Sequence, residues 1–261
     1  MITSCPQRFA RGVLLLAVTI AVLPVASASA QIAPCAEGGA PQSTCTFVDD
    51  VAPYDAFLEL ACTRNLMAGC GGAYACPGEA VLREDMAVHL ERLYRGEGTA
   101  HVFTPADTCA SKCTFADLTP SHCLAGWICQ LYKDGITGGC PTGYCGAEAV
   151  KREQMAVFLS VVISWRLGET IPTSGLLCRA PGDCRSYACQ SGGTSAFSDV
   201  TPNSVYCKFI HYIAFKGVTS GCGVWEFCPT IAIPREQMAV FLVASDNLIS
   251  GTPVPSTNTC Q

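Results

Sequence analysis

Apolar side chains recur along this chain at helical spacing, and the clearest run lies near its middle. Leu124, Ile128 and Leu131 stand at positions i, i+4 and i+7, which is typical of a helix with one buried face. Gly135 follows as a residue able to end a helix with a positive φ. A second apolar stripe begins at Met155. The pattern predicts two short helices joined by a turn.

The same order of features occurs three times. The related stretches are "NLMAGCGGAYACPGEAVLREDMAVHL" from Asn65, "GITGGCPTGYCGAEAVKREQMAVFL" from Gly135 and "GVTSGCGVWEFCPTIAIPREQMAVFL" from Gly217. Their leads are "TFVDDVAP" from Thr46, "TFADLTP" from Thr114 and "AFSDVTP" from Ala196. The spacing from the lead Phe to the Arg that begins the second helix is 36, 37 and 38 residues. Such self-similarity indicates repeated units that bury their apolar faces against one another.

The repeats span 45–93, 113–165 and 195–245, and insertions fall between them. The segment 166–194 holds three cysteines among Gly, Ser and Pro, so we expect a linker that is a disulfide-stapled loop rather than a domain. Nothing of domain size remains outside the three repeats. One core built from all three is therefore expected.

Residues 1–30 have the pattern of a cleaved secretory signal. Arg8 and Arg11 precede an apolar run, Val13–Val25, and small residues lead to a cleavage site after Ala30. A membrane anchor is the competing interpretation, but the run is short for a span of about 20 residues. We therefore expect an exported protein with no transmembrane segment after cleavage.

Charge and cysteine content narrow the class further. Loss of the signal changes the formal net charge from −5 to −7, which argues against nucleic acid as a partner. It also leaves eighteen of the nineteen cysteines, an even number that favours disulfides in an exported chain. Zinc is the alternative, but there is no CxxC and the histidines are not paired at ligand spacing. No metal or cofactor is expected.

Three cysteine pairs recur at the same place in the repeats. They are Cys70–Cys76, Cys140–Cys145 and Cys222–Cys228, and we expect each to close a local loop. Equivalence between repeats suggests further pairs: Cys45–Cys62 with Cys113–Cys129, and Cys109–Cys123 with Cys189–Cys207. Cys178–Cys184 and Cys35–Cys260 then remain. Their connectivity stays open, because sequence alone does not determine it.

Three ordered motifs carry a family resemblance. In the second repeat they are the lead Phe115-Ala116-Asp117-Leu118, the turn Gly135-Ile136-Thr137-Gly138 and the helix start Lys151-Arg152-Glu153-Gln154. They resemble the FxDV, GI-x-G and TRAE motifs of the S-layer homology family, and the resemblance covers all three repeats. It implies a mainly α fold in which three helix–turn–helix modules pack as a pseudo-threefold helical body, here stapled by disulfides. Such triplets bind cell-wall-linked polysaccharide in grooves between modules.

The resemblance also implies binding residues. They are Arg83, Arg152 and Arg235, then Asp50, Asp117 and Asp199, and the turn glycines Gly135 and Gly217. In the first repeat Asp50 fits the spacing to proline and is preferred, while Asp49 fits the spacing to phenylalanine and stays open. Arginine suits an anionic glycan because its planar fork matches carboxylate-like groups. The alternative is that Arg and Asp act as a scaffold within each module.

Departures from the family pattern leave the identity of the ligand open. The Thr of TRAE is replaced here by Leu82, Lys151 and Pro234 in the three repeats. The Glu of TRAE is replaced by Asp85, Gln154 and Gln237. The first repeat is the most diverged, with Asn65 at the turn glycine, so its groove is the one expected to be inactive. His89 replaces a phenylalanine of the other repeats and is interpreted as a core residue rather than a ligand or pH sensor.

No GxSxG, HExxH or phosphate-loop motif occurs, so we expect no catalysis. Trp225 lies between two cysteines, where it would either stack on a sugar or pack within its loop. The favoured function is a non-catalytic protein of the cell-envelope surface that binds wall or surface polysaccharide. The alternative is a structural module at the cell surface that binds other surface proteins through the same grooves or the linker.

Overall fold

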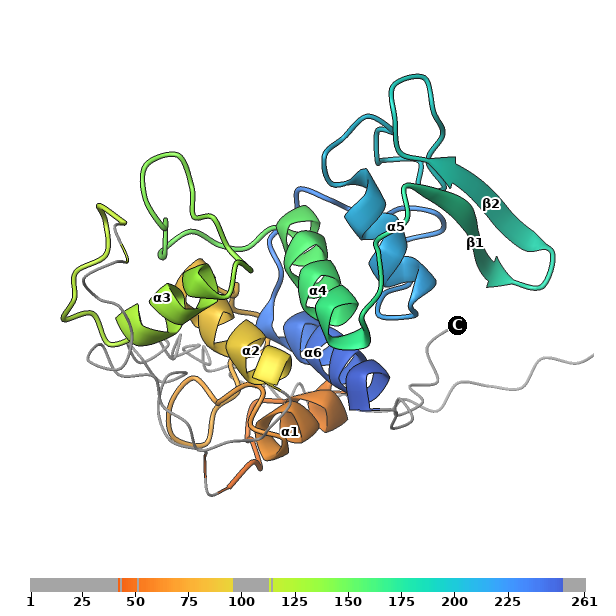
Figure 1. The fold of residues 1–261 in the computed structure, drawn as a ribbon. Helices are drawn as coiled ribbons and strands as arrows, with labels where there is room; N and C mark the ends of the chain where they lie inside the picture. Colours follow the sequence, from red (N-terminus) through yellow and green to blue (C-terminus); the bar gives the residue numbers. More distant parts are fainter. Residues whose placement is uncertain (1–41, 43, 51, 96–112, 114, 251–261) are drawn as a thin grey trace, which may run out of the picture.

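The computed structural model describes residues 42, 44–50, 52–95, 113 and 115–250, which form six α-helices and one two-stranded sheet (Figure 1). The helices are α1 (Asp55–Thr63), α2 (Arg83–Arg95), α3 (Ala125–Lys133), α4 (Arg152–Leu167), α5 (Cys207–Phe215) and α6 (Arg235–Ser250). The strands are β1 (Ser174–Ala180) and β2 (Asp183–Ala188). Each predicted repeat thus contributes one short helix and one longer helix.

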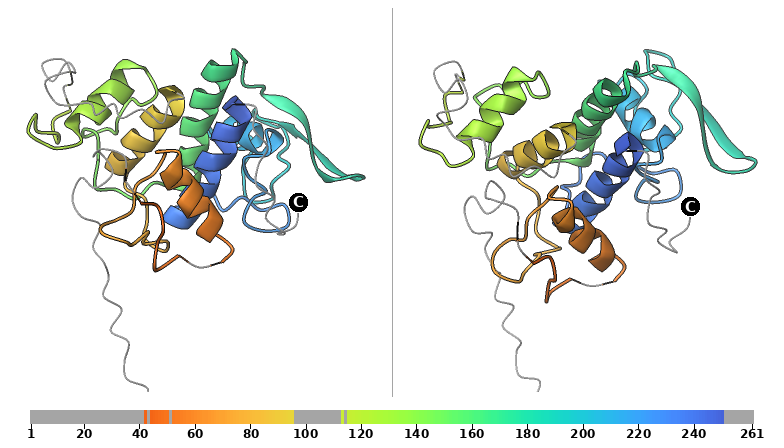
Figure 2. Two further views of the ribbon diagram at one scale, coloured as in Figure 1. Left: turned by 90° about the horizontal axis from the view of Figure 1, so that it is seen from below. Right: turned by 60° about the horizontal axis from the view of Figure 1, so that its bottom comes forward.

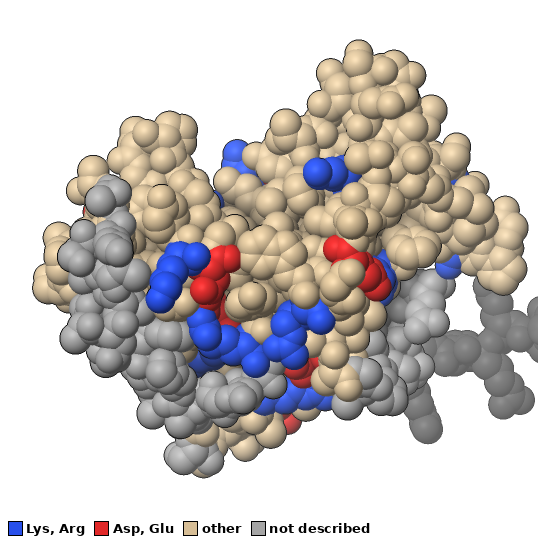
Figure 3. All heavy atoms as spheres, in the orientation of Figure 1, with Lys and Arg blue, Asp and Glu red and all other residues tan. Residues whose placement is uncertain are grey.

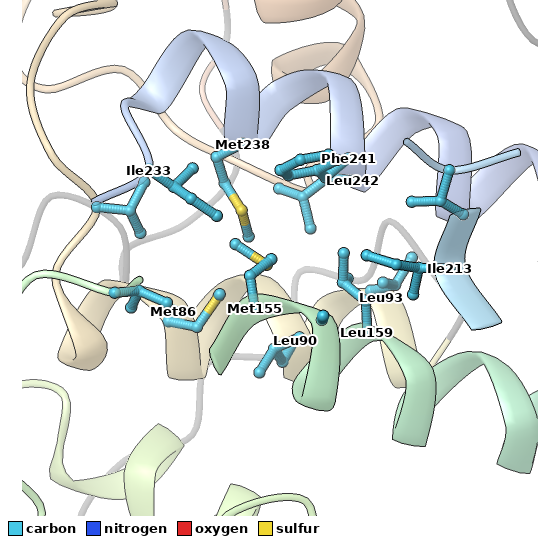
Figure 4. Close-up of a cluster of buried hydrophobic side chains, with 14 of the residues drawn as sticks. Met86, Leu90, Leu93, Met155, Leu159, Ile213, Ile233, Met238, Phe241 and Leu242 are labelled. Atoms are coloured by element: carbon cyan, nitrogen blue, oxygen red, sulfur yellow. The ribbon is translucent and has the colours of Figure 1, made fainter. Parts of the chain in front are cut away.

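The second helices of the three repeats build the centre of the core. α2, α4 and α6 contact one another in pairs and lie side by side in all views (Figures 1 and 2). Met86, Leu90, Met155 and Met238 point into the space between them (Figure 4), and each is at most 1% exposed. Full burial of such a side chain contributes about 1.5–3 kcal/mol, so this cluster is a main source of stability.

The first helices pack on a different repeat from their own. α3 packs on α2, α5 packs on α4, and α1 packs on α6. Each short helix therefore covers the long helix of another repeat, so that the repeats interlock around the core. Helical periodicity predicts which face of a helix is buried, but it does not identify the helix that covers it.

Three extended segments meet at the start of the long helices. The N–H of Val81 donates to the carbonyl of Ile233, that of Ile233 to Val150, and that of Val150 to Val81, each at 2.9 Å. All three residues are 0% exposed. This closed cycle of buried backbone hydrogen bonds ties the three repeats together.

A hairpin makes the fold mixed α/β. β1 and β2 pair antiparallel, with Cys178 opposite Cys184 in the register. A Pro181-Gly182 turn joins the strands, and Gly182 adopts φ +85°, which suits glycine at the third position of a tight turn. The expectation of a mainly α, pseudo-threefold helical body was therefore wrong. The linker is a sheet attached to one repeat only, and extended segments meet at the centre.

Seven cysteine pairs are joined in the described part of the chain. They are Cys45–Cys62, Cys70–Cys76, Cys113–Cys129, Cys140–Cys145, Cys178–Cys184, Cys189–Cys207 and Cys222–Cys228. The expected pairs Cys109–Cys123 and Cys35–Cys260 include residues outside that part. Because disulfides at this density form in oxidising compartments, the protein matures outside the reducing cytosol. None of the described helices is both long and apolar enough to span a bilayer.

Candidate functional site

The three motif arginines lie inside the protein, at the first residue of each long helix. Arg83, Arg152 and Arg235 are 5%, 4% and 0% exposed. Their Nε atoms donate to the carbonyls of Tyr144 at 3.0 Å, Phe227 at 2.8 Å and Ala75 at 2.8 Å, respectively. Each arginine therefore binds the cysteine-closed loop of another repeat rather than solvent.

Aromatic rings flank two of these guanidinium groups. The guanidinium carbon of Arg152 lies 4.9 Å from the ring centroid of Phe227 and 5.4 Å from that of Phe241. Gln237 accepts a hydrogen bond of 2.9 Å from its Nη1. Burial lowers the pKa of Arg152, and the Asp199 carboxylate opposes that shift. The arrangement holds a buried cation by aromatic faces and carbonyl oxygens.

The lead aspartates bind the same loops from the other side. Asp117 accepts from the backbone N–H groups of Tyr144 and Cys145, both at 2.7 Å. Asp199 accepts from Phe227 at 2.8 Å and from Cys228 at 2.7 Å. One residue in each loop is thus held at its N–H by aspartate and at its carbonyl by arginine. We call this arrangement the loop clamp.

In the first repeat the clamp uses Asp49 rather than Asp50. The carboxylate of Asp49 accepts from Ala75 N at 2.6 Å and from Cys76 N at 2.8 Å. The spacing from phenylalanine therefore identifies the equivalent aspartate. The spacing to proline misleads because the lead of this repeat carries one extra residue.

The turn positions share one backbone conformation. Gly135 and Gly217 have φ values of +74° and +73°, and Asn65 has +53°. Asparagine is among the few residues that tolerate this left-handed region, so the first repeat keeps the turn without glycine. These residues end the short helices, and none of them lines the pocket described below.

Trp225 packs against the hairpin. It is 2% exposed, its Nε1 donates to Asp183 at 3.1 Å, and Arg185 lies over its ring at 4.6 Å. The ring is therefore not available to stack on a sugar. His89 is likewise fully buried, with Nδ1 at 3.0 Å from the carbonyl of Leu66.

A pocket of about 310 Å³ lies between the first and second repeats. Polar groups reach it from three segments: Glu84 at the start of α2, Asp117 and His122 ahead of α3, and Glu148 ahead of α4. Apolar side chains, Leu118, Ile128 and Tyr144, line it as well. It thus combines hydrogen-bonding groups with an apolar surface, as ligand pockets do, and its volume lies at the small end of their range of about 300–1,000 Å³.

Two features define the charge of the pocket. Hydrogen bonds from the Tyr144 and Cys145 amides hold the pKa of Asp117 below its ordinary value, so this carboxyl stays ionised. His122 Nε2 lies 3.5 Å from Glu84 Oε2, close enough for an ion pair when the imidazole is protonated. The pocket is therefore rich in hydrogen-bond acceptors and negative in sign.

Among the expected glycan-binding residues only Asp117 lines the pocket, together with Cys145 of an expected disulfide. Sequence reasoning missed Glu84, His122, Gly146 and Glu148. One signal was available for Gly146, because the other repeats carry Pro77 and Pro229 at this position. The backbone geometry is shared, because the second residue of each long helix is a glutamate whose N–H donates to the carbonyl at this position. Glu84 donates to Gly146, Glu153 to Pro229 and Glu236 to Pro77.

Among the residues that the structure describes, two groups of side chains have the spacing of metal ligands. They are Cys189, Cys207 and His211, and Asp199, Cys222 and Cys228. In both groups the two sulfurs are joined as a disulfide, so neither offers the thiolate that binds metal. His211 is instead structural, since its Nε2 accepts from Ala196 N at 3.0 Å.

The surface drawn in Figure 3 mixes charges of both signs. Most Lys, Arg, Asp and Glu side chains visible on this face gather in a band across its middle, and most of the rest of the described surface in this view is uncharged. Within the described chain, Arg95 pairs with Asp134 at 2.6 Å and Lys216 with Glu169 at 2.5 Å. This face does not present an extended field of one sign to a charged polymer.

No known protein-family model matches the chain, and no curated protein matches it.

Proposed function

We propose that this chain is an exported, non-catalytic protein of the cell envelope that binds polysaccharide in the groove between its first and second repeats. The pocket at that groove is the observation that carries the proposal. The likeness of the lead, turn and helix-start motifs to S-layer homology modules supports the same function.

The chemistry of the pocket suits a sugar. Sugars present hydroxyl groups around apolar C–H faces, so they need acceptors and an apolar wall at the same site. Glu84 and Asp117 supply carboxylate oxygens, and the partly exposed Leu118 supplies apolar surface. A hydrogen bond to a charged group contributes about 1.5–3 kcal/mol, so two or three of them account for useful affinity.

Asp117 lines the pocket, whereas the motif arginine takes part indirectly. The loop clamp of Arg83 and Asp117 holds Tyr144, whose side chain forms part of the pocket wall. Tyr144 also donates its hydroxyl to the carbonyl of Arg83 at 2.6 Å. The clamp therefore positions the binding surface, and the arginine itself does not line the pocket.

Co-sedimentation with an insoluble envelope preparation from the producing cells tests the proposal. The oxidised protein should bind, and a Glu84→Gln, His122→Ala variant should bind at least tenfold more weakly, because the Glu84 carboxylate and the His122 imidazole are both lost. The matched control is Glu153→Gln, Ser204→Ala at the equivalent positions of the next repeat, which should bind normally. Equal binding by both variants would contradict the assignment.

Protease treatment of the envelope separates a glycan from a protein ligand. Binding should survive digestion, because polysaccharide is left intact. Loss of binding after digestion would instead identify a surface protein as the partner. Circular dichroism of each variant should match that of the unsubstituted protein, so that a folding defect is not read as lost affinity.

A further inference from the structure

The pocket between the first and second repeats differs in charge from the site that the motif arginines would form. Three carboxylates line it, those of Glu84, Asp117 and Glu148, and no Lys or Arg is among its lining residues. Its one titratable base is His122, beside Glu84. A ligand in this pocket therefore meets hydrogen-bond acceptors of negative charge.

The nearest motif cation is turned away from the pocket. Arg83 donates its Nε to the carbonyl of Tyr144. Its guanidinium carbon lies 5.3 Å from the ring centroid of Tyr144 and 5.8 Å from that of Phe158. With only 5% of the residue exposed, the guanidinium is committed to the protein interior. Its charge contributes to the lowered pKa of Asp117, but Arg83 is not among the lining residues and offers no donor to a ligand in the pocket.

We propose that this pocket takes a sugar residue without acidic substituents and excludes sugars that carry carboxylate, phosphate or pyruvate groups. The inference rests on the proposed polysaccharide function and names the ligand class of the same site. Sugar hydroxyls donate hydrogen bonds to carboxylate oxygens, whereas an anionic substituent would be repelled at the same distance.

Gly146 gives the pocket its shape. A Cβ at this position would stand 2.9 Å from Oε2 and 3.3 Å from Cβ of Glu84, so any larger residue displaces the glutamate. The corresponding residues of the other repeats, Pro77 and Pro229, are larger. Glycine therefore makes the first groove different from the other two, and it belongs to the specificity of the site.

Fractionated polysaccharide tests the ligand class. Envelope polysaccharide is separated by anion exchange into a non-retained fraction and a retained, acidic fraction, and the affinity of the oxidised protein is measured for each. The protein should bind the non-retained fraction at least tenfold more tightly. Glu148→Lys should reduce this difference in affinity, because it replaces a negative charge at the pocket with a positive one. Glu148 is exposed, so the substitution should not disturb the core.

The outcomes distinguish the ligand class from the polysaccharide-binding function itself. Equal or tighter binding of the acidic fraction overturns the ligand class while the polysaccharide function stands. Binding of neither fraction overturns the function itself. Gly146→Ala should weaken binding at least fivefold, whereas Gly138→Ala, whose Cβ meets nothing within 4 Å, should not. Unchanged binding by folded Gly146→Ala overturns the role given to this residue.

Discussion

At the residue scale, the recurring Asp and Arg have a common role, because both bind the backbone of the same loop. In the second repeat Asp117 binds the N–H of Tyr144 while Arg83 binds its carbonyl. Leaving buried or partly buried backbone groups without partners is costly, so a loop of this kind needs a donor and an acceptor supplied by side chains. The loop therefore gives a structural reason for the recurrence of these residues.

Asp49 and Asp50 offer an internal comparison at this scale. Asp49→Asn should lower the free energy of unfolding by about 1–3 kcal/mol, since it weakens charge-assisted bonds to Ala75 and Cys76. Asp50→Asn should change it by less than about 0.5 kcal/mol, because Asp50 is not the aspartate that binds the loop. Urea unfolding of both variants measures the difference. A larger loss of stability in Asp50→Asn than in Asp49→Asn would contradict the assignment of the loop clamp to Asp49.

At the element scale, the hairpin shows where sequence patterns stop being informative. In β1 and β2 only Leu177 and Tyr187 are buried, so the strands lack the strict alternation that identifies a half-buried strand. The long helices were predictable, because charged starts and apolar stripes occur in each repeat. The exchange of covering helices was not, because it depends on contacts between distant segments.

The burial of Trp225 was unpredictable for the same reason. Its position between two cysteines gave no sign that Asp183 and Arg185 of the hairpin would cover it. The pocket was missed for a related reason. Its walls come from three segments far apart in the chain, and a motif within one segment identifies only Asp117.

Glu91 links two elements in a way that depends on pH. It is a fully buried residue of α2 whose Oε2 accepts from Arg95 Nε at 3.0 Å, and Arg95 in turn binds Asp134 after α3. Burial raises the pKa of Glu91 from 4.5 to about 8, and the Asp134 charge adds to the shift. The folded protein therefore retains this proton to a higher pH than the unfolded chain does.

The sign of the pH dependence follows. The contribution of Glu91 to the free energy of unfolding is fully present below pH 4.5 and is lost as pH rises to about 8. Between pH 5 and pH 8.5 the unsubstituted protein should lose more stability than Glu91→Gln, which stays neutral. Urea unfolding at the two pH values checks this, with exposed Glu79→Gln as the control. An equal loss of unfolding free energy in all three proteins would contradict the raised pKa of Glu91.

At the scale of the whole molecule, three repeats form one interlocked body whose grooves are not equivalent. The backbone cycle of Val81, Val150 and Ile233 joins the repeats. The hairpin packs on the third repeat, however, whereas the pocket at Gly146 lies between the first and second repeats. The repeats and their spacing were evident in the sequence. The diverged first repeat, whose groove is expected to be inactive, contributes Glu84 to the pocket.

The most direct measurement is an amide NMR titration of the isotopically labelled, oxidised protein with oligosaccharides released from the non-retained envelope fraction. Saturable shifts are expected at Gly146, Ala147 and Glu148. None of comparable size is expected at Thr230 and Ile231, which correspond to Ala147 and Glu148 in the third repeat. Shifts centred on Thr230 and Ile231, or no saturable shift at Gly146 to Glu148, would contradict binding at this pocket.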